Sequence, residues 1–506
     1  MFTHSGDDSA IVVGAGLGGL AAAMRLGAKG WRVTVLDRLD RPGGRGSSVV
    51  RGGHRFDLGP TIVTMPDVFR ELWEATGRVF DDDVDLRPMD PFYEIRWPDG
   101  ARFRACSDSE RMVEEVRRLS PQDIRGYLRF LRGAEKRYEV GFKRLGRVPM
   151  HDIRETLKVL PAFARLRADR SILGHSRAHV KDERLRMALS FHPLFIGGDP
   201  ARVTSIYALV SHLEKEFGVH YAMGGVQAIA DAMVRVIEAQ GGQVRLGVTV
   251  DEIGVEGGRV TGVRCGNEHV PAPLVVSNAD AGHTYSALVK GRKRRWSPAK
   301  LNRQRWSMGL FVWYFGTKGT RLKWQDVGHH TIINGPRYEG LLRDIFRRGV
   351  LAEDMSLYLH RPSVTDPGVA PEGDDTFYAL SPVPHLGWNS VDWTAERESY
   401  RAKVAKVLDQ HIPGFEAHVS ASHILTPLDF ESRYLSPHGC GFSIEPRILQ
   451  SAWFRPHNIS EEAKGLYLVG AGTHPGAGLP GVISSAEVLG QLVPDAPQHD
   501  IRLAAE

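Results

Sequence analysis

The chain of 506 residues has few cysteines, no long uninterrupted apolar run and no large excess of charge. Cys106, Cys265 and Cys440 are widely spaced, so the sequence predicts neither a disulfide framework nor a zinc site, and a reducing cytoplasm fits. The longest apolar stretch, residues 11–28, is broken by five glycines and an arginine, so no segment is expected to span a bilayer. Residues 1–9 hold two aspartates and no apolar core, so no signal peptide is expected.

Several chemistries have no counterpart in the sequence. It contains no Ser-His-Asp arrangement, metal-binding motif, P-loop or fixed-period repeat that stands out. Its 65 basic and 60 acidic residues give a net charge of +5, which is too mild to indicate nucleic-acid binding. With 42% apolar and 25% charged residues, the composition predicts a folded protein of two or three domains.

The stretch 10–37 predicts a dinucleotide-binding unit. An apolar strand at 10–13 leads into Gly14, Gly16 and Gly19 at the GxGxxG spacing, and a helix follows to residue 28. These glycines permit a tight turn, a close approach of a pyrophosphate to the backbone, and close packing of helix on sheet. Asp37 ends the second strand, where a carboxylate accepts hydrogen bonds from a ribose diol, and this argues against NADP.

The segment that follows favours FAD over NAD. Residues 41–45 (RPGGR) and 56–61 (FDLGPT) resemble the extended FAD fingerprint of the large amine-oxidase-like flavoprotein superfamily. In that superfamily the arginine and the glycine-rich turn lie along the diphosphate and the flavin ring. The alternative interpretation is an ordinary surface turn at Gly43-Gly44 and a solvated charge at Arg45.

Further along the chain, strands and helices alternate in a two-domain pattern. A hairpin is expected at 90–104, two helices at 109–137, and mostly helical structure at 143–216. A helix at 226–240 and strands at 243–246, 248–255, 259–264 and 274–277 return to the pattern of the first unit. Strands dominate from 306 to 435, with helices at 338–347 and 393–410, and the chain ends in a strand at 465–470, a glycine-rich turn and a helix at 482–492.

Two basic stretches are candidates for contact with an anionic membrane. In 156–172 the apolar residues Leu157, Leu160, Phe163 and Leu166 recur at helical spacing between basic residues. A second cluster, 290–305, holds eight basic residues, no acid, and Trp296. The alternative is a solvated face over a stripe that packs on the core.

Several long strings resemble the bacterial-type phytoene desaturases of carotenoid biosynthesis. They are GAGTHPGAGLPGVISSAE at the C-terminal end, residues 190–226, 381–388 and 442–458, and the similarity covers essentially the whole chain. The resemblance implies FAD as the redox cofactor, an apolar tunnel, peripheral membrane attachment, and stepwise desaturation of phytoene to neurosporene or lycopene. Ala471 stands where many flavoproteins of the superfamily carry an acid.

The expected fold is α/β, with a discontinuous Rossmann-like FAD-binding domain, a mixed-sheet substrate domain and a helical membrane-facing subdomain. FAD-binding parts are expected at 1–85, 219–290 and 441–506, substrate-domain parts at 86–140 and 291–440, and the helical subdomain at 141–218. Motif and resemblance together predict these cofactor-binding residues: Gly14, Ala15, Gly16, Gly18, Gly19, Asp37, Arg38, Gly44, Arg45, Gly59, Pro60, Thr61, Val250, Gly472, Leu479, Pro480, Gly481 and Val482.

The chemistry of a desaturation sets what the site must supply. Hydride leaves a carbon next to a double bond, so the substrate stabilises its own allylic cation. The reduced flavin needs positive potential, and the N-terminus of helix 482–492 is the candidate for it. No base can be named from the sequence: Thr473 and His474 are weak candidates, Glu445 and Asp280 weaker ones, and no dedicated base is required if flavin or water accepts the proton.

A substrate of about forty carbons could not be captured from water. Its transfer from an apolar phase into water costs roughly 0.8 kcal/mol per CH₂, or about 30 kcal/mol for the whole molecule. The partners expected are therefore membrane lipids and a polyene dissolved in them, with oxygen or a quinone as terminal acceptor. Two alternatives stay open. One is a sister desaturase or isomerase acting on a later or shorter polyene, and the other is a lipid carrier of this fold without redox activity.

Overall fold

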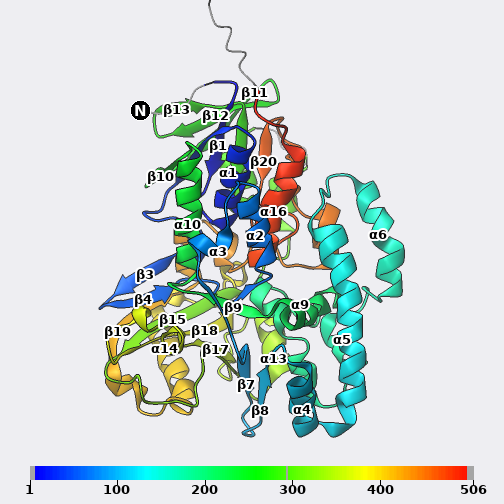
Figure 1. Cartoon of the computed structure of the whole chain (residues 1–506), viewed down its shortest axis with the longest axis vertical. Helices are drawn as coiled ribbons and strands as arrows, with labels where there is room; N and C mark the ends of the chain where they lie inside the picture. The colour runs from blue at the N-terminus through cyan, green and yellow to red at the C-terminus, as the bar shows by residue number, and fades with distance from the viewer. Residues whose placement is uncertain (1–5, 292–294, 498–506) are drawn as a thin grey trace, which may run out of the picture.

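A five-stranded parallel sheet forms one end of the molecule (Figure 1). The structure is a computed structural model that describes residues 6–291 and 295–497. The strand order is β10-β2-β1-β14-β20, with the central strand β1 buried along its whole length, as expected for a parallel sheet covered on both faces. The bounds are β1 Ser9–Val13, β2 Arg32–Asp37, β10 Gln243–Leu246, β14 Leu274–Ser277 and β20 Leu466–Leu468.

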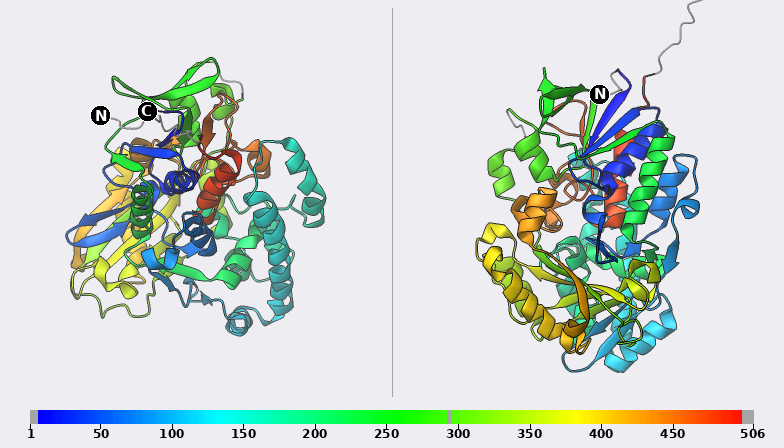
Figure 2. Two further views of the ribbon diagram at one scale, coloured as in Figure 1. Left: turned by 45° about the horizontal axis from the view of Figure 1, so that its top comes forward. Right: turned by 90° about the vertical axis from the view of Figure 1, so that its left-hand side faces the viewer.

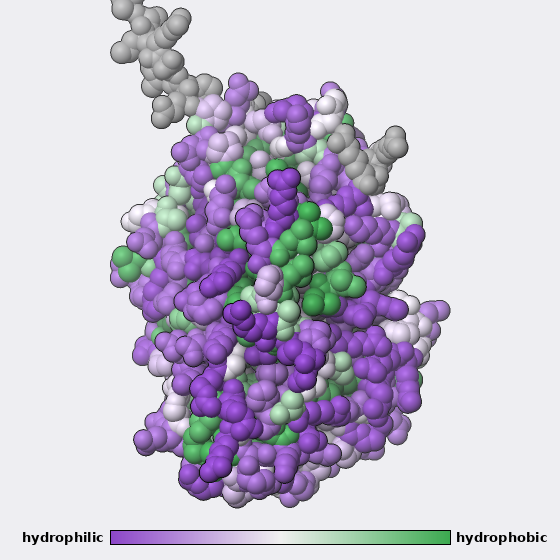
Figure 3. Space-filling model, turned by 90° about the vertical axis from the view of Figure 1, so that its right-hand side faces the viewer, coloured by the Kyte–Doolittle hydropathy of each residue, from purple (hydrophilic) through white to green (hydrophobic). Residues whose placement is uncertain are grey.

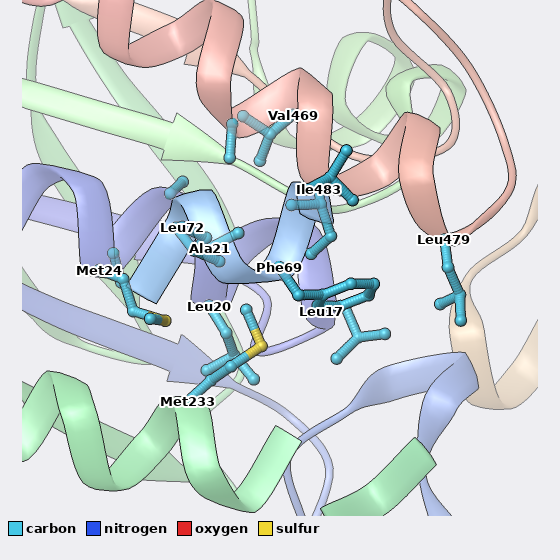
Figure 4. Close-up of a cluster of buried hydrophobic side chains, with 14 of the residues drawn as sticks. Leu17, Leu20, Ala21, Met24, Phe69, Leu72, Met233, Val469, Leu479 and Ile483 are labelled. Carbon is cyan, nitrogen blue, oxygen red and sulfur yellow. The ribbon is translucent and has the colours of Figure 1, made fainter. Parts of the chain in front are cut away.

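Helices cover one face of this sheet and a small antiparallel sheet covers the other. Helix α1 (Leu17–Ala28) packs between α10 (Val226–Ala239) and α16 (Leu479–Leu492) (Figures 1 and 2). Figure 4 shows Leu20 and Met24 of α1 packed with Leu72 of α2 and Met233 of α10. The opposite face packs against β11 (Glu252–Glu256), β12 (Arg259–Cys265) and β13 (Glu268–Pro271). The glycine-rich turn is therefore held by a fully packed core.

A seven-stranded mixed sheet forms the other end of the molecule, in the order β19-β15-β18-β17-β16-β7-β8. Strand β15, the second in this order, is buried throughout and alternates between two clusters, because successive side chains point to opposite faces. Phe311, Trp313 and Phe315 pack under α14 (Trp393–Asp409), whereas Leu310, Val312 and Tyr314 face the interior of the molecule. The bounds are β7 Tyr93–Arg96, β8 Arg102–Ala105, β15 Gly309–Thr317, β16 His330–Ile333, β17 Leu357–His360, β18 Asp375–Val383 and β19 Val419–Leu425.

A mostly helical region stands beside both sheets, with α5 and α6 at its outer edge (Figure 1). Of two smaller sheets, β3-β4 packs against β18 and β19, and β5-β9-β6 contacts α9 and α16. The bounds of these strands are β3 Ser48–Arg51, β4 His54–Asp57, β5 Val63–Thr64, β6 Leu86–Pro88 and β9 Val219–Ala222. The remaining helices are α2 Asp67–Glu74, α3 Phe80–Asp83, α4 Ser109–Leu119, α5 Ile124–Tyr138, α6 Ile153–Arg165, α7 Ile172–Arg177, α8 Glu183–Ala188, α9 Leu209–Phe217, α11 Ala281–His283, α12 Pro298–Asn302, α13 Tyr338–Arg343 and α15 Pro427–Tyr434.

The structure corrects several predicted elements. The strand expected at 248–255 begins only at Glu252, and β13 was not predicted, because its short, polar sequence carries little alternation. The last helix begins at Leu479, so Pro480 lies inside its first turn, where a missing N–H breaks no helix bond. The amphipathic stretch 156–172 is not one helix, because α6 ends at Arg165 and Arg167 takes a left-handed conformation (φ 52°).

The second basic cluster does not present its tryptophan to a membrane. Trp296 is fully buried, its ring stacks on Tyr285 with centroids 6.0 Å apart, and the Lys300 ammonium lies 4.0 Å from its centroid. Part of this predicted cluster, residues 292–294, lies outside the described residues. Among the described residues, no helix is both long and apolar enough to cross a bilayer.

Candidate functional site

A cavity of about 720 Å³ lies where the two ends of the molecule meet. One wall is built from loops that follow strands of the parallel sheet, at its carboxyl edge, where ligands bind in open α/β sheets. The opposite wall includes Leu310, Val312 and Tyr314 of the seven-stranded sheet. The predicted residues that line this cavity are Gly16, Gly18, Arg45, Gly59, Pro60, Thr61, Leu479, Pro480, Gly481 and Val482.

The glycine loop is held in its shape by close contacts that admit no side chain. Gly14 has a φ of 100°, and its N–H donates to the Leu36 carbonyl oxygen at 2.7 Å. A Cβ on Gly19 would lie 2.0 Å from the Gly14 carbonyl oxygen, so the first turn of α1 could not pack there. A Cβ on Gly16 or Gly18 would lie 2.7 Å from the side chain of Asn278. The loop therefore exposes backbone to the cavity, as a pyrophosphate site requires.

Asn278 belongs to the site although the sequence reasoning missed it. It directly follows β14, and its side-chain amide lies 3.4 Å from the Gly14 carbonyl oxygen. The signal available in the sequence was that Asn278 directly follows the strand predicted at 274–277, at the end where ligands bind in parallel sheets. Only the pairing of β14 with β1 brings the two segments together.

The Asp37 carboxylate lies at the predicted strand end and braces the same loop. It accepts hydrogen bonds from the backbone N–H of Ala15 at 2.7 Å and of Leu39 at 2.8 Å. Burial raises the pKa of this carboxyl, and the two backbone N–H groups oppose that shift. Arg38 does not reach the cavity, because its guanidinium donates to the carbonyl oxygens of Ser432 and Arg433 at 2.8 Å.

The turn at Gly43-Gly44 is not a free surface turn. Both glycines have positive φ, and a Cβ on Gly44 would lie 3.3 Å from Gly16 Cα. The next residue, Arg45, is half-buried on the cavity wall and donates to the Ser436 hydroxyl, while its Nε has no partner within the described structure. A Cβ on Gly59 would lie 2.1 Å from the Arg45 carbonyl oxygen, so the two predicted segments pack directly on each other.

The C-terminal turn closes the site. Gly478 (φ 100°) precedes α16, whose first residues line the cavity; Pro480 has no N–H, and the Val482 N–H donates to the Gly478 carbonyl oxygen at 2.9 Å. Gly472 lies behind that wall, where a Cβ would meet Ala281 N and Ser443 Oγ at 2.9 Å. Val250 also lies behind the wall, in an apolar cluster with Val13 and Leu36.

A buried arginine that sequence reasoning missed supports this turn from below. Arg455 is 1% exposed and donates to the carbonyl oxygens of Ala471 (2.7 Å), Thr473 (3.1 Å), Ile444 (3.1 Å) and Gln450 (3.3 Å). Burial lowers the pKa of its guanidinium. No motif marked Arg455, because its role depends on backbone carbonyl groups of residues 444–450 and 471–473 that only the fold brings around it.

The two weak catalytic candidates are held differently. The Thr473 hydroxyl donates to the Pro456 carbonyl oxygen at 2.6 Å, and Thr473 does not line the cavity. His474 lines the cavity: its Nε2 lies 3.0 Å from the Leu145 carbonyl oxygen, its Nδ1 has no partner within the described residues, and burial lowers its pKa to about 4. Glu445 and Asp280 are buried away from the cavity wall.

The cavity wall carries two polar groupings that the sequence did not reveal. In the first, Thr61 Oγ1 lies 2.7 Å from the hydroxyl oxygen of Tyr358. In the second, the Tyr93 hydroxyl donates to Glu214 Oε2 at 3.0 Å, and His192 Nε2 lies 3.2 Å from the same carboxylate oxygen. Both groupings join residues far apart in the chain, so no local motif could announce them.

The comparisons with known proteins place this geometry in a family. The model of the flavin containing amine oxidoreductase family matches residues 17–487. A neurosporene-forming phytoene desaturase of Cereibacter sphaeroides is 65% identical over 97% of this chain and 95% of its own length. A lycopene-forming phytoene desaturase of a Paracoccus strain is 43% identical over 96% and 97%. An oxidoreductase from Methanosarcina mazei shares the fold, with a TM-score of 0.65, 19% identity, and coverage of 96% and 100%.

The chain therefore belongs to the flavin containing amine oxidoreductases, with FAD as its cofactor. Within that family it is a bacterial-type phytoene desaturase, an FAD-dependent oxidoreductase that acts on CH–CH bonds. The site fits the cofactor, since a Cβ on Gly16 or Gly18 would clash with Asn278, so the loop keeps bare backbone at the cavity wall, and Arg45, whose Nε has no partner within the described residues, lies on the same wall. The glycine loop, Arg45 and the start of α16 would hold FAD, which when bound supplies the hydride acceptor.

Proposed function

We propose that this chain desaturates phytoene in successive steps and releases mainly neurosporene. The observation that carries the proposal is one continuous cavity that joins the FAD cradle to an apolar opening at the surface. Two relatives above 60% identity are named as neurosporene-forming, and the lycopene-forming relatives are near 40%. A sister polyene as substrate is less favoured for that reason, and the intact glycine cradle argues against a carrier without redox activity.

The residues of the chain support this chemistry mainly by enclosing the hydrocarbon away from water and by placing a helix N-terminus beside it. Apolar side chains from several elements, Leu310 and Val312 of β15 among them, face the cavity, so a hydrocarbon can lie against apolar surface over most of the wall. Water is excluded from the reacting carbon, which prevents its capture while a positive charge develops beside the double bond. The first turn of α16 points its N–H groups at the same space and supplies roughly half an elementary positive charge.

We propose that the cavity opens onto a membrane through a surface that we name the mouth patch, made of Ile153, Leu157, Leu160, Ile448, Leu449 and Phe454. All six side chains are more than a third exposed, and Leu160, Ile448, Leu449 and Phe454 also line the cavity. Residues 452–454 pack against α6, so the two halves of the patch are adjacent. Figure 3 views this side of the molecule, where apolar side chains gather among polar ones.

The charge around the mouth patch supports peripheral attachment. Lys158, Arg165, Arg167 and Arg170 are exposed on or just after α6, and basic residues beside an apolar patch attract an anionic bilayer. A helical region at 141–218 would then face the membrane and admit the polyene directly from it. Oxygen or a quinone is the proposed terminal acceptor, and a quinone would share the same bilayer.

The test is the pigment extract of a host that accumulates phytoene, with and without this protein, resolved by chromatography and absorption. Yellow neurosporene as the main product supports the proposal, and red lycopene would change the number of steps. Unchanged phytoene in a host that contains the yellow flavoprotein would contradict the substrate assignment. The Gly16→Val variant is the control, because without FAD it should leave phytoene unchanged.

A further inference from the structure

Each desaturation releases a proton inside an apolar cavity, and a short line of hydrogen bonds leads from the cavity wall to a buried histidine. Thr61 and Tyr358 both line it, with Thr61 Oγ1 2.7 Å from the Tyr358 hydroxyl oxygen. The same hydroxyl lies 2.5 Å from Nδ1 of His330. All three residues are less than 9% exposed, so the line runs through the interior of the protein.

The hydrogen bonds end at His330, whose Nε2 has no partner within the described residues, and two more histidines lie beside it. His329 Nε2 lies 3.0 Å from His360 Nε2, and His329 Nδ1 lies 2.7 Å from Oγ1 of Thr365. The His330 ring is stacked on that of His360, and one ring nitrogen of each of the three histidines lies within 4.8 Å of the others. Thr365 is partly exposed, so the separate set of contacts from His360 through His329 to Thr365 reaches the protein surface.

We propose that Thr61, Tyr358 and His330 form a relay that takes the proton from the substrate, with His330 as its acceptor. The inference rests on the proposed function. The substrate C–H bond breaks and its proton goes to the Thr61 oxygen, the Thr61 proton goes to Tyr358, and the Tyr358 proton goes to His330 Nδ1. The hydride of the same step goes to FAD, so one C=C bond forms, FAD is reduced, and one imidazolium results.

The surroundings of His330 suit a transient acceptor. Burial lowers its pKa to about 3, so the ring is neutral and can accept a proton before each step. A proton beside an allylic cation is acidic enough to be taken by a weak base, and a base that holds the proton loosely releases it readily. The negative charge gained by the flavin compensates the imidazolium while both persist. His329 and His360 are also buried, and burial lowers their pKa well below the usual range.

The relay gives specific variants to compare. Tyr358→Phe removes the central hydroxyl, and His330→Asn keeps a hydrogen-bond acceptor near Nδ1 but has no basic nitrogen. Tyr400→Phe is the matched control, because its buried hydroxyl has a comparable bond, 2.8 Å to Ser381, on the other face of the sheet. Each protein, loaded with FAD, is placed in liposomes that contain phytoene. Flavin reduction is followed without oxygen in H₂O and D₂O, and proton release is followed with an indicator dye.

Tyr358→Phe and His330→Asn are expected to slow flavin reduction about 100-fold or more and to lose the solvent isotope effect, with FAD content and reduction by dithionite unchanged. Tyr400→Phe should match the wild type within threefold. Rates within threefold of wild type in both test variants would overturn the relay. Glu214→Gln tests the second polar grouping of the wall, in which His192 contacts Glu214. If this variant alone loses flavin reduction, the proton acceptor belongs to that grouping and the relay is overturned.

A stoichiometric metal ion that disappears in His330→Asn would make the three histidines ligands and would also overturn the relay. If phytoene fails to reduce the wild-type flavin, the substrate assignment fails and the relay falls with it. The two failures can be told apart. If only the relay is wrong, the test variants reduce FAD as fast as the wild type does; if the substrate assignment is wrong, phytoene reduces the flavin in none of the proteins.

Discussion

The mouth patch makes a prediction whose size can be worked from exposure. Leu157, Leu160 and Leu449 expose 52%, 49% and 70% of their surface in the protein. Fully burying a leucine contributes about 2 kcal/mol, so inserting these three exposed portions into a bilayer contributes about 3 kcal/mol. Changing all three to serine should therefore weaken liposome binding by a factor on the order of 100.

The assay is flotation with liposomes over a range of lipid concentrations, with FAD content as the check on folding. Leu322→Ser is the matched control, because Leu322 is the most exposed of the large apolar residues in the described chain at 82% and does not line the cavity. It should bind liposomes as the wild type does. A triple variant that binds within threefold of the wild type would refute the reasoning and remove this surface from the membrane interface.

Three further outcomes follow from the packing. Gly16→Val should purify without FAD, since even a Cβ there meets Asn278 at 2.7 Å; a variant with full flavin absorbance would show the cradle is misplaced. Trp296→Ala should lower the free energy of unfolding by about 3–5 kcal/mol in urea without changing flotation, and reduced flotation would return the second basic cluster to the membrane interface. Burial raises the pKa of Glu445 to about 7 from 4.5. Protonated Glu445 therefore stabilises the folded protein fully below pH 4.5, and this contribution is lost as the pH rises through 7. In Glu445→Gln the free energy of unfolding in urea should not show this loss. An identical pH profile of the unfolding free energy in both proteins would contradict the prediction.

Local patterns were enough to find the nucleotide-binding half of the molecule. The strand, glycine turn and helix of 9–28 follow from glycine spacing and an apolar run, which act within a few residues. The same holds for Asp37 at its strand end and for the turn that precedes α16. The amphipathic spacing of α6 left open whether its apolar stripe faces a membrane or the core, and the structure divides it: Leu157 and Leu160 are exposed, whereas Phe163 and Leu166 pack against a core cluster.

The rest depended on contacts between distant segments. Asn278 meets the glycine loop only through the pairing of β14 with β1, and Arg455 is held by carbonyl groups on both sides of it in the sequence, at 444–450 and 471–473. The line from Thr61 to His330 crosses nearly 300 residues of sequence. Trp296 looked like a membrane anchor in a basic segment, yet tertiary packing buries it. Sequence alone determined the cofactor unit because its signals are local, whereas the polar groups on the cavity wall were decided by tertiary structure, because hydrogen bonds between distant residues leave no periodic trace.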